Sequence, residues 1–474
     1  MIIRLIEPAP PGWHVYSKVH LPRLGLPIIG ATLKQQGHDV VIYAADLAPI
    51  DWEDVYTADL VGITTTTSTV TQAYEFADDL GQRGIPVVVG GTHVTFMAAE
   101  ALEHVPYVAR GEGGEQLMLE LIEALRGERP LESIRGLSFM RAGQAVHNPL
   151  REPAPDLDAL PFPDLTLVHG SERIRQTPVM TSWGCPFDCN FCSVTAMFGK
   201  KYRFRSPENV IAELREKAPK RVFFYDDNFA ANRKRLKTLL QMMIDEGITP
   251  SWSAQVRTDV ARDHELLDLM RRSGCWCVYL GLESINQATL DRYEKSQSVD
   301  DIIRAVHTLH DHGISTHGMF VLGADDDTVD TVRGTVDFCV KHKIDTIMLN
   351  ILTPLPGTPL FDELEAEERI FDKRWHLYDA MHIVYQPKHM TPYELQREMI
   401  RAYVRFYSLR HWLKYLFTFR FTKLVLQTWG YSIVRSWRKD ERNKAYVKAL
   451  RHLRLPKPPK LVRRSRVDSD RSVW

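Results

Sequence analysis

Three cysteines within eight residues are the part of the sequence best suited to do chemistry. Cys185, Cys189 and Cys192 have the spacing Cys-x3-Cys-x2-Cys and directly follow an apolar segment that starts near Val179. Thiolates are the usual ligands of iron–sulfur clusters, and a 4Fe-4S cubane needs one ligand for each iron. Three thiolates therefore predict a 4Fe-4S cluster with one open iron, and an open position is typical of catalytic metal sites.

Other metal sites leave different patterns. A zinc site favours paired Cys-x2-Cys knuckles, and a ferredoxin site continues to a fourth cysteine nearby; neither pattern is present here. Cys275 or Cys277 could still supply a fourth ligand, and the cluster would then be closed and serve only structure or electron transfer. Because Cys275, Cys277 and Cys339 lie in strand or helix patterns, we expect them to be small buried hydrophobes instead.

The composition excludes several classes of protein. With three of its six cysteines crowded together, the chain lacks the dispersed framework of a secreted disulfide protein. Its start, Met1 to Glu7, is too short and too soon charged for a signal peptide, and no apolar run approaches the roughly 20 residues of a membrane-spanning helix. We therefore expect a cytoplasmic protein without a transmembrane segment.

The front of the chain predicts an α/β domain. Residues 1–130 alternate short apolar runs with helical patterns, which indicates a doubly wound parallel sheet. Such sheets bind ligands at the carboxyl ends of their strands. Loops that contain Thr64, Gly90, Gly91 and Thr92 follow two of the predicted strands, so we expect these residues to contact a cofactor.

The rest of the chain predicts three further regions. Residues 131–176 are rich in proline and, apart from a hairpin between Gly136 and Val146, are predicted to be a linker with little core of its own. Residues 391–474 are predicted to be helical and basic, with a disordered end. Between them, residues 177–390 carry six strand patterns, too few for a closed barrel of eight units, and so predict a partial (β/α)6 barrel. We expect its strands near residues 179–183, 221–226, 251–257, 276–283, 315–322 and 346–352.

Three features of the sequence resemble the radical S-adenosylmethionine (SAM) superfamily. They are the cysteine loop, its place after the first strand of a six-unit barrel, and the aromatic Phe191 before the last cysteine. The front sheet resembles the cobalamin-binding domain that precedes the barrel in one large subgroup. Within that subgroup, four segments are similar to the anaerobic magnesium-protoporphyrin IX monomethyl ester oxidative cyclase and its relatives. The segments are residues 90–97 (GGTHVTFM), 110–112 (RGE), 184–187 (GCPF) and 353–361 (TPLPGTPLF).

This resemblance covers roughly residues 1–410 and implies a reaction. The reduced cluster passes an electron to SAM, which releases methionine and a 5'-deoxyadenosyl radical that abstracts hydrogen from an unactivated carbon. A 4Fe-4S cluster, SAM and cobalamin are the implied cofactors, and a flavodoxin or ferredoxin is the implied reductant. Methylation and oxidative cyclisation or coupling of a small-molecule or lipid-like substrate both fit. No residue is marked as catalytic by a motif.

The resemblance also implies SAM-binding residues where barrel strands end. Asp226 or its neighbour Asp227 would face the SAM amino group, although either could instead cap the helix that begins near Arg233. Four further residues lie at the ends of the third and fourth strands or within the cluster loop. Arg257 would pair with the SAM carboxylate, Glu283 and Ser284 would bond the ribose hydroxyls, and Phe191 would either contact adenine or only pack the loop.

A histidine ligand for cobalt is not expected. The motif that usually announces one, Asp-x-His-x-x-Gly, is absent, because Gly12 and Ser17 stand at its Asp and Gly positions around His14. We interpret His14 as a loop residue and His93, beside Gly91, as part of the cavity wall.

The C-terminal region is strongly basic, with 20 Lys and Arg against four Asp and Glu from Arg401 to Trp474. Its interleaved aromatic and basic residues suit a helical cap on the acidic body, a helix on an anionic membrane surface, or RNA binding. Nucleic acid is the least favoured partner. RNA-modifying methylthiotransferases of this superfamily carry a second three-cysteine set in front, and residues 1–184 contain no cysteine.

Overall fold

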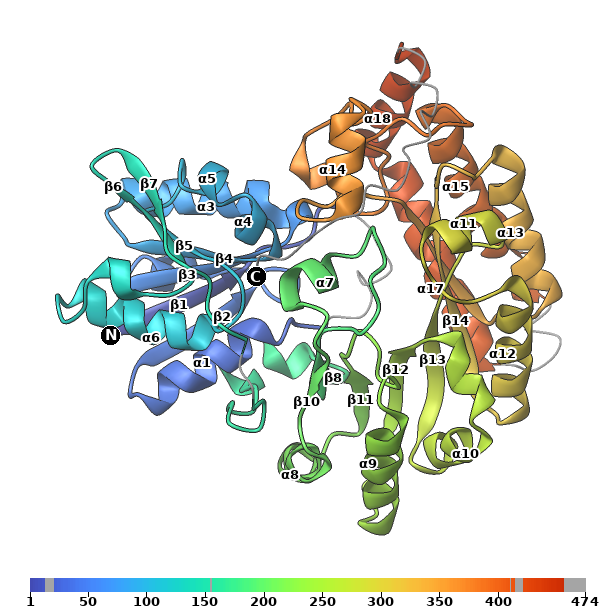
Figure 1. Cartoon of the computed structure of the whole chain (residues 1–474), viewed down its shortest axis with the longest axis horizontal. Helices are drawn as coiled ribbons and strands as arrows, with labels where there is room; N and C mark the ends of the chain where they lie inside the picture. The colour runs from blue at the N-terminus through green and yellow to red at the C-terminus, as the bar shows by residue number, and fades with distance from the viewer. Residues whose placement is uncertain (13–20, 154–155, 410, 414–420, 456–474) are drawn as a thin grey trace, which may run out of the picture.

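The computed structural model describes residues 1–12, 21–153, 156–409, 411–413 and 421–455. Two large sheets, each covered by helices, follow one another along the chain, and a group of helices completes the second (Figure 1). The predicted fold class is confirmed: a doubly wound, mainly parallel sheet precedes a six-stranded partial barrel and a helical C-terminal region.

The first sheet has the strand order β2-β1-β3-β4-β5-β6-β7, and its first five strands run parallel. These strands are short runs rich in Val and Ile, as expected for a sheet that is buried on both faces. They are β1 (Ile2–Glu7), β2 (Asp39–Ala44), β3 (Leu60–Thr65), β4 (Val87–Gly91) and β5 (Tyr107–Ala109). The strand order reverses between β1 and β3, and sheets of this kind bind ligands beside that point.

Helices cover both faces of the first sheet. α1 (Gly25–Gln35) and α6 (Gly114–Leu125) pack on one face, and α3 (Val70–Gln82), α4 (Thr92–Phe96) and α5 (Ala98–Ala101) pack on the other. The short α2 (Trp52–Val55) leads into β3. Each face has its own buried core, so the carboxyl ends of the strands are held in fixed positions.

A hairpin of β6 (Leu137–Arg141) and β7 (Gln144–His147) continues the first sheet with antiparallel pairing. The sequence predicted the hairpin but placed it in a linker with little core. The structure instead makes it part of the first sheet, because Leu137 and Phe139 are buried together with residues of α1 and α6. Leu137 and Phe139 are two positions apart on β6, so their side chains point to the same face of the strand.

The second sheet forms the partial barrel, with the parallel strand order β15-β14-β13-β12-β11-β8. Its strands are β8 (Thr177–Val179), β11 (Arg221–Phe224), β12 (Ser251–Val256), β13 (Cys275–Glu283), β14 (Ser315–Leu322) and β15 (Thr346–Ile351). The first predicted strand is divided in two. Only β8 joins the barrel, whereas β9 (Ser182–Trp183) leaves it to pair with β10 (Arg203–Phe204) at the base of the cysteine loop.

Six helices pack on the outer face of the barrel. They are α8 (Pro207–Lys217), α9 (Arg233–Asp245), α10 (His264–Arg272), α11 (Gln287–Arg292), α12 (Val299–Asp311) and α13 (Val329–Lys341). On β11, Val222 and Phe224 are buried in the core beneath these helices. Because side chains alternate along a strand, Phe223 and Tyr225 face the inside of the barrel.

The C-terminal helices complete the barrel at its open edge. α14 (Pro359–Ala366) follows β15, and α15 (Pro392–Phe406), α17 (Phe421–Lys439) and α18 (Glu441–His452) form a layer beyond it (Figure 1). The hydroxyl of Tyr403 accepts the backbone N–H of Leu349 at 2.7 Å and donates to its carbonyl oxygen at 3.0 Å. Tyr407 does the same for Ile347. Two tyrosines thus satisfy backbone groups that edge strand β15 would otherwise leave unpaired, and α15 covers this edge of the barrel.

We expect Tyr403→Phe to lower the free energy of unfolding by about 1–3 kcal/mol, because the buried N–H and C=O of Leu349 then lose their partner. Tyr393→Phe on the same helix is the matched control, since the Tyr393 hydroxyl makes no hydrogen bond with the described residues. The control should change stability by less than about 0.5 kcal/mol. Chemical denaturation measures both variants, and equal losses would show that the hydroxyl of Tyr403 has no special role.

No helix among the described residues combines the length and the apolar character that crossing a bilayer requires.

Candidate active site

The cysteine loop begins where β9 leaves the barrel and ends where α7 (Ser193–Phe198) begins. Cys192 is the N-cap residue of α7, and its backbone N–H donates to the carbonyl oxygen of Cys189 at 3.0 Å. The loop is also held from outside, because the N–H of Leu360 donates to the carbonyl oxygen of Asn190 at 3.1 Å. The predicted iron ligands therefore lie on one compact, anchored turn at the carboxyl end of the barrel.

The three loop cysteines are free thiols that are partly accessible to solvent. Burial raises the pKa of each thiol, that of Cys192 to about 12. The thiols of Cys185, Cys189 and Cys192 also act electrostatically on one another. Iron must displace a proton from each thiol when it binds. Among the described residues, no three Cys, His, Asp or Glu side chains converge on a single metal ion. Three thiols on one turn are instead the ligand set of a cubane, in which each thiolate binds a different iron.

The closed-cluster alternative needs a fourth cysteine near this loop. Cys275 and Cys277 are buried near the amino end of β13, whereas Glu283 ends the strand close to Cys189. At about 3.3 Å per residue, Cys277 lies roughly 20 Å along the strand from Glu283. Neither cysteine can reach the loop without unfolding β13. Cys275, Cys277 and Cys339 are all buried, which confirms that they are small core residues.

The two neighbouring aspartates after β11 have different surroundings. Asp226 is completely buried and accepts hydrogen bonds from the Thr181 N–H at 3.1 Å, from the Thr181 hydroxyl at 2.9 Å and from Ser182. It therefore holds β9 beside β11. Asp227 is open to solvent at the carboxyl edge of the barrel and acts electrostatically on Cys185 and Cys192. The surrounding protein atoms and the Asp226 carboxylate raise the pKa of Asp227 to about 7.

Asp227→Asn is expected to weaken SAM binding about tenfold or more while leaving stability unchanged, because it would remove the charge-assisted contact predicted between Asp227 and the SAM ammonium. Asp226→Asn should instead leave SAM binding unchanged and lower the free energy of unfolding. It leaves its three donors with one acceptor too few and costs about 1.5–3 kcal/mol of stability. Calorimetric titration of SAM into the reconstituted protein and chemical denaturation give the two readouts. If Asp226→Asn alone weakened SAM binding, the assignment of the two roles would be reversed.

Glu283 lies at a distorted point of β13. The register of β13 with β14 shifts between Gly281 and Glu283, and Glu283 itself has a left-handed φ of 61°. Its carboxylate pairs with Lys295 at 2.6 Å, and both side chains are about nine-tenths buried. Bulges and left-handed non-glycine residues often occur at functional sites, where they redirect a side chain. The bulge directs Glu283 toward Cys189, on whose thiol both Glu283 and Lys295 act.

Arg257 lies beside the cluster loop, and Phe191 is part of it. The Arg257 guanidinium stacks 3.7 Å from the centre of the Phe187 ring and donates to the carbonyl oxygen of Lys295. Phe191 packs edge-on against Tyr293, with ring centroids 4.7 Å apart, so its ring packs the cluster loop against the segment after α11. Ser284 is buried, and its hydroxyl accepts the Asn286 N–H at 3.0 Å, which gives it a role in the turn after β13.

Thr64, Gly90, Gly91 and Thr92 lie together at the carboxyl edge of the first sheet and remain partly accessible. A side chain at Gly91, whose φ is 112°, would come within 2.2 Å of the Thr65 carbonyl oxygen. Close approach of β3 and β4 therefore requires glycine at position 91 whether or not a ligand binds. The accessible backbone of this edge, beside the point where the strand order reverses, fits a large flat cofactor.

Of the two histidines considered as cobalt ligands, His93 lies among the described residues. His93 is buried, packs edge-on against Trp375 at 4.9 Å, and points Nε2 to Glu100 at 3.4 Å. This is the environment of a wall residue, although its Nδ1 is buried without a partner among the described residues. His14 lies outside the described residues.

Contacts between the front sheet and the barrel were not recognised from the sequence. Glu112, in the loop after β5, forms a buried ion pair at 2.5 Å with Arg203 on β10. Gly357 packs so closely on Phe96 of α4 that a side chain there would come within 2.4 Å of the ring. Only the short motifs around these residues signalled their importance. The two contacts join the carboxyl edge of the first sheet to the cluster side of the barrel, as Figure 1 shows for α4 and α7.

Two family models match the chain. The radical SAM superfamily matches residues 179–339, and the B12 binding domain matches residues 15–119. Fold and site therefore define a radical SAM enzyme with a B12-binding domain in front of its barrel.

Proteins with similar sequences show which enzymes of this class the chain resembles. The chain is 33% identical to the uncharacterized methyltransferase PH0819 of Pyrococcus horikoshii, over 81% of this chain and 88% of the relative. It is 30% identical to the bacteriochlorophyllide d C-12(1)-methyltransferase of Chlorobaculum tepidum, over 79% and 80%. It is 31% identical to the anaerobic magnesium-protoporphyrin IX monomethyl ester cyclase of Cereibacter sphaeroides, over 68% and 55%.

A solved structure shares the fold. The radical SAM methyltransferase TsrM from Kitasatospora setae, with cobalamin and a 4Fe-4S cluster bound, superposes with a TM-score of 0.65 at 21% identity, over 78% of this chain and 76% of that one. The chain belongs to the cobalamin-dependent radical SAM family of methyltransferases and oxidative cyclases. Its cofactors are a 4Fe-4S cluster, SAM and cobalamin, as the sequence predicted.

Proposed function

We propose that this enzyme transfers a methyl group to an unactivated carbon of an amphiphilic small molecule, such as a tetrapyrrole or a polycyclic lipid. The observation that carries the proposal is the placement of the two cofactor edges. The Glu112–Arg203 pair and the contact of Gly357 with Phe96 hold the carboxyl edge of the front sheet against the cluster side of the barrel. A methyl carrier on one edge and a radical source on the other can then act on one substrate.

The bound groups would supply the difficult chemistry: the cluster an electron for SAM cleavage, and cobalamin a methyl group. The protein's own residues would bind and orient. Cys185, Cys189 and Cys192 would hold the cluster, and Asp227 and Arg257 would face the charged groups of the SAM methionyl end. The buried Glu283–Lys295 pair beside Cys189 would fix the polar wall of the site.

The inside of the barrel is suited to an amphiphilic substrate. Tyr225, Gln255, Met319 and Asn350 alternate with buried core residues and remain partly accessible, so the wall mixes polar and apolar groups. Below them a floor is formed by three rings: Tyr279 packs against Phe223 at 5.5 Å and against His317 at 4.7 Å. Burial lowers the pKa of His317 to about 4, so this floor is uncharged at neutral pH.

Methyl-deuterated SAM separates methylation from oxidative cyclisation. The anaerobically reconstituted enzyme is incubated with reductant, cobalamin, labelled SAM and candidate tetrapyrroles or lipids, and products are analysed by mass spectrometry. Methylation places a CD3 group in the product and consumes SAM both as methyl donor and as radical source. A product that loses hydrogen and gains no label would instead assign cyclase chemistry. Absence of 5'-deoxyadenosine would contradict radical initiation altogether.

Contact with a membrane surface through the C-terminal helices is a second part of the proposal. Of the eleven exposed large hydrophobic side chains among the described residues, seven lie after residue 403. Leu409, Leu413, Val425 and Trp429 are among them, and the Trp412 indole donates to Thr428 at 3.0 Å, which joins residues 411–413 to α17. Apolar side chains among basic ones are typical of surface-bound helices. Flotation with vesicles should recover the full chain and fail to recover a Trp429→Ser/Val425→Ser variant that still cleaves SAM.

A further inference from the structure

A groove of about 530 Å³ runs between α15 and α18 on the outside of the C-terminal layer. Seven Lys and Arg side chains from α15, α17 and α18 line it, and no Asp or Glu of the described residues does. Some of this charge is neutralised from outside the groove. Arg397 and Arg401 share the buried carboxylate of Glu398, Arg405 pairs with Asp337, and Lys444 pairs with Glu441.

Three of the cations make no ion pair with the described residues: Arg438, Lys448 and Arg451 are exposed, and their side chains are free to meet a ligand. The chain that continues beyond residue 455 does not supply the missing negative charge, since residues 456–474 contain six Lys or Arg and two Asp. The groove therefore carries an excess of positive charge that an anionic ligand would complement.

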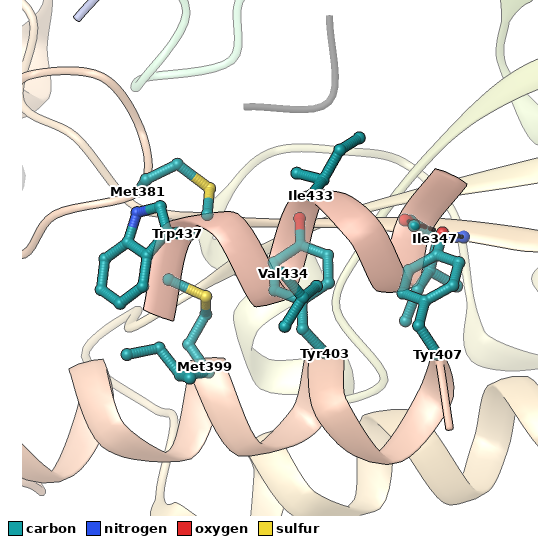
Figure 2. Close-up of a pocket in the computed structure, with 10 residues that line it drawn as sticks. Ile347, Met381, Met399, Tyr403, Tyr407, Ile433, Val434 and Trp437 are labelled. Atoms are coloured by element: carbon teal, nitrogen blue, oxygen red, sulfur yellow. Dashed lines mark hydrogen bonds between the residues drawn. The ribbon is translucent and has the colours of Figure 1, made fainter. Parts of the chain in front are cut away.

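The floor of the groove is aliphatic. Ile400 and Val404 of α15 and Val447 of α18 contribute to it, and Val404 is 37% exposed. Ile400 and Trp437 also line an apolar cavity of about 40 Å³ beneath α17, whose other walls include Met381 and Met399 (Figure 2). Methionine walls adapt readily to irregular apolar ligands. A ligand with an anionic head and an aliphatic chain would match both the charged rim and the apolar floor.

This combination favours a lipid over a nucleic acid. Proteins bind single strands by stacking bases on open aromatic faces. In the groove, the ring of Tyr393 is covered by the Arg397 guanidinium at 5.4 Å, and Trp437 is only 4% exposed. A free inorganic anion would leave the aliphatic floor without a partner. The acyl chain of a phospholipid would cover it.

We propose that the groove between α15 and α18 binds the phosphate head of an anionic membrane phospholipid, with the start of an acyl chain on the floor formed by Ile400, Val404 and Val447. The inference deepens the proposed membrane contact. The groove supplies selectivity for anionic lipid, whereas the exposed apolar side chains near Trp429 supply general affinity for a bilayer.

The test is flotation of the full-length, reconstituted enzyme with vesicles of phosphatidylcholine alone or with about one quarter phosphatidylglycerol. We expect binding to be at least about tenfold stronger with the anionic lipid, and the triple variant Arg438→Glu/Lys448→Glu/Arg451→Glu to lose this preference. The matched control is Lys220→Glu/Arg221→Glu/Lys234→Glu. It reverses three exposed cations that make no ion pair with the described residues and lie on the barrel away from the groove, and it should keep the preference.

Val404→Ser/Val447→Ser tests the floor, and should weaken binding to phosphatidylglycerol vesicles without changing the affinity for soluble glycerol phosphate. SAM cleavage at the wild-type rate shows that each variant is folded. Equal binding to both vesicle types, equal losses in both charge-reversal variants, full competition by inorganic phosphate, or displacement of the vesicles by RNA would each overturn the groove assignment. Equal binding to both vesicle types would leave the general membrane contact standing, and the SAM cleavage rate reports separately on the enzyme.

Discussion

Replacing Cys189 by alanine is expected to abolish the 4Fe-4S cluster and to reduce SAM cleavage more than about a thousandfold. Two thiolates cannot hold a cubane that already has one iron without a protein ligand. The measurements are iron and sulfide content, the EPR spectrum of the dithionite-reduced protein, and release of 5'-deoxyadenosine. Alanine at Cys185 or Cys192 should have the same effect, because the three thiols lie on one turn between β9 and α7.

The matched controls for this prediction are Cys275→Ala and Cys277→Ala. Both cysteines are buried near the amino end of β13, away from the loop, so their removal should leave the iron content and the EPR spectrum unchanged. Each control should cost stability, since a buried side chain becomes smaller, by about 1–2 kcal/mol. Loss of the cluster in either control would revive the closed, four-cysteine site. Addition of SAM should change the EPR spectrum of the wild-type protein only if one iron is open.

Glu112→Ala is expected to lower the free energy of unfolding by about 3–5 kcal/mol, because it leaves the Arg203 guanidinium buried without its carboxylate. The side chains of this pair are 6% and 4% exposed, so solvent cannot compensate. Chemical denaturation of the reconstituted protein measures the effect. We also expect faster proteolysis between the front sheet and the barrel, because the pair joins these two parts.

Two further variants make this second prediction specific. Glu112→Leu/Arg203→Met removes both charges and should recover most of the lost stability, as buried pairs replaced by apolar residues often do. Glu132→Ala breaks the exposed pair with Arg141 and should cost less than about 1 kcal/mol. If Glu112→Ala cost no more than Glu132→Ala, the pair would not hold the two parts together.

Much of the architecture followed from local pattern. Short apolar or alternating runs at regular intervals predicted the strands of the barrel, because each strand must bury at least one face beneath the helices. The first of these predicted strands is divided in the structure, and only β8 joins the barrel. The hairpin of β6 and β7 was predicted as an element and misplaced as a linker. Whether a hairpin stands alone or extends a sheet depends on its partner strand, here β5, and no local pattern specifies that partner.

The individual site residues were less predictable than the loop. Asp226 and Asp227 are adjacent and chemically identical, and only the fold makes one a buried acceptor for Thr181 and Ser182 and leaves the other open. Lys295 had no signal at all, because it lies in an irregular segment between α11 and α12, and its burial becomes understandable only beside Glu283. Long-range electrostatic pairs of this kind leave no periodicity in the sequence.

The sequence by itself determined the thiolate turn, because three ligands within eight residues are local and need only a short loop to meet. It also determined the order of a front sheet, a six-unit barrel and a basic helical end, since each rests on short-range periodicity. Only the tertiary structure decided which carboxylates face the thiols, that Cys275 and Cys277 lie too far away to close the cluster, and that Glu112 meets Arg203. Those decisions depend on contacts between residues tens to hundreds of positions apart, which form only when the two sheets and the helices around them pack together.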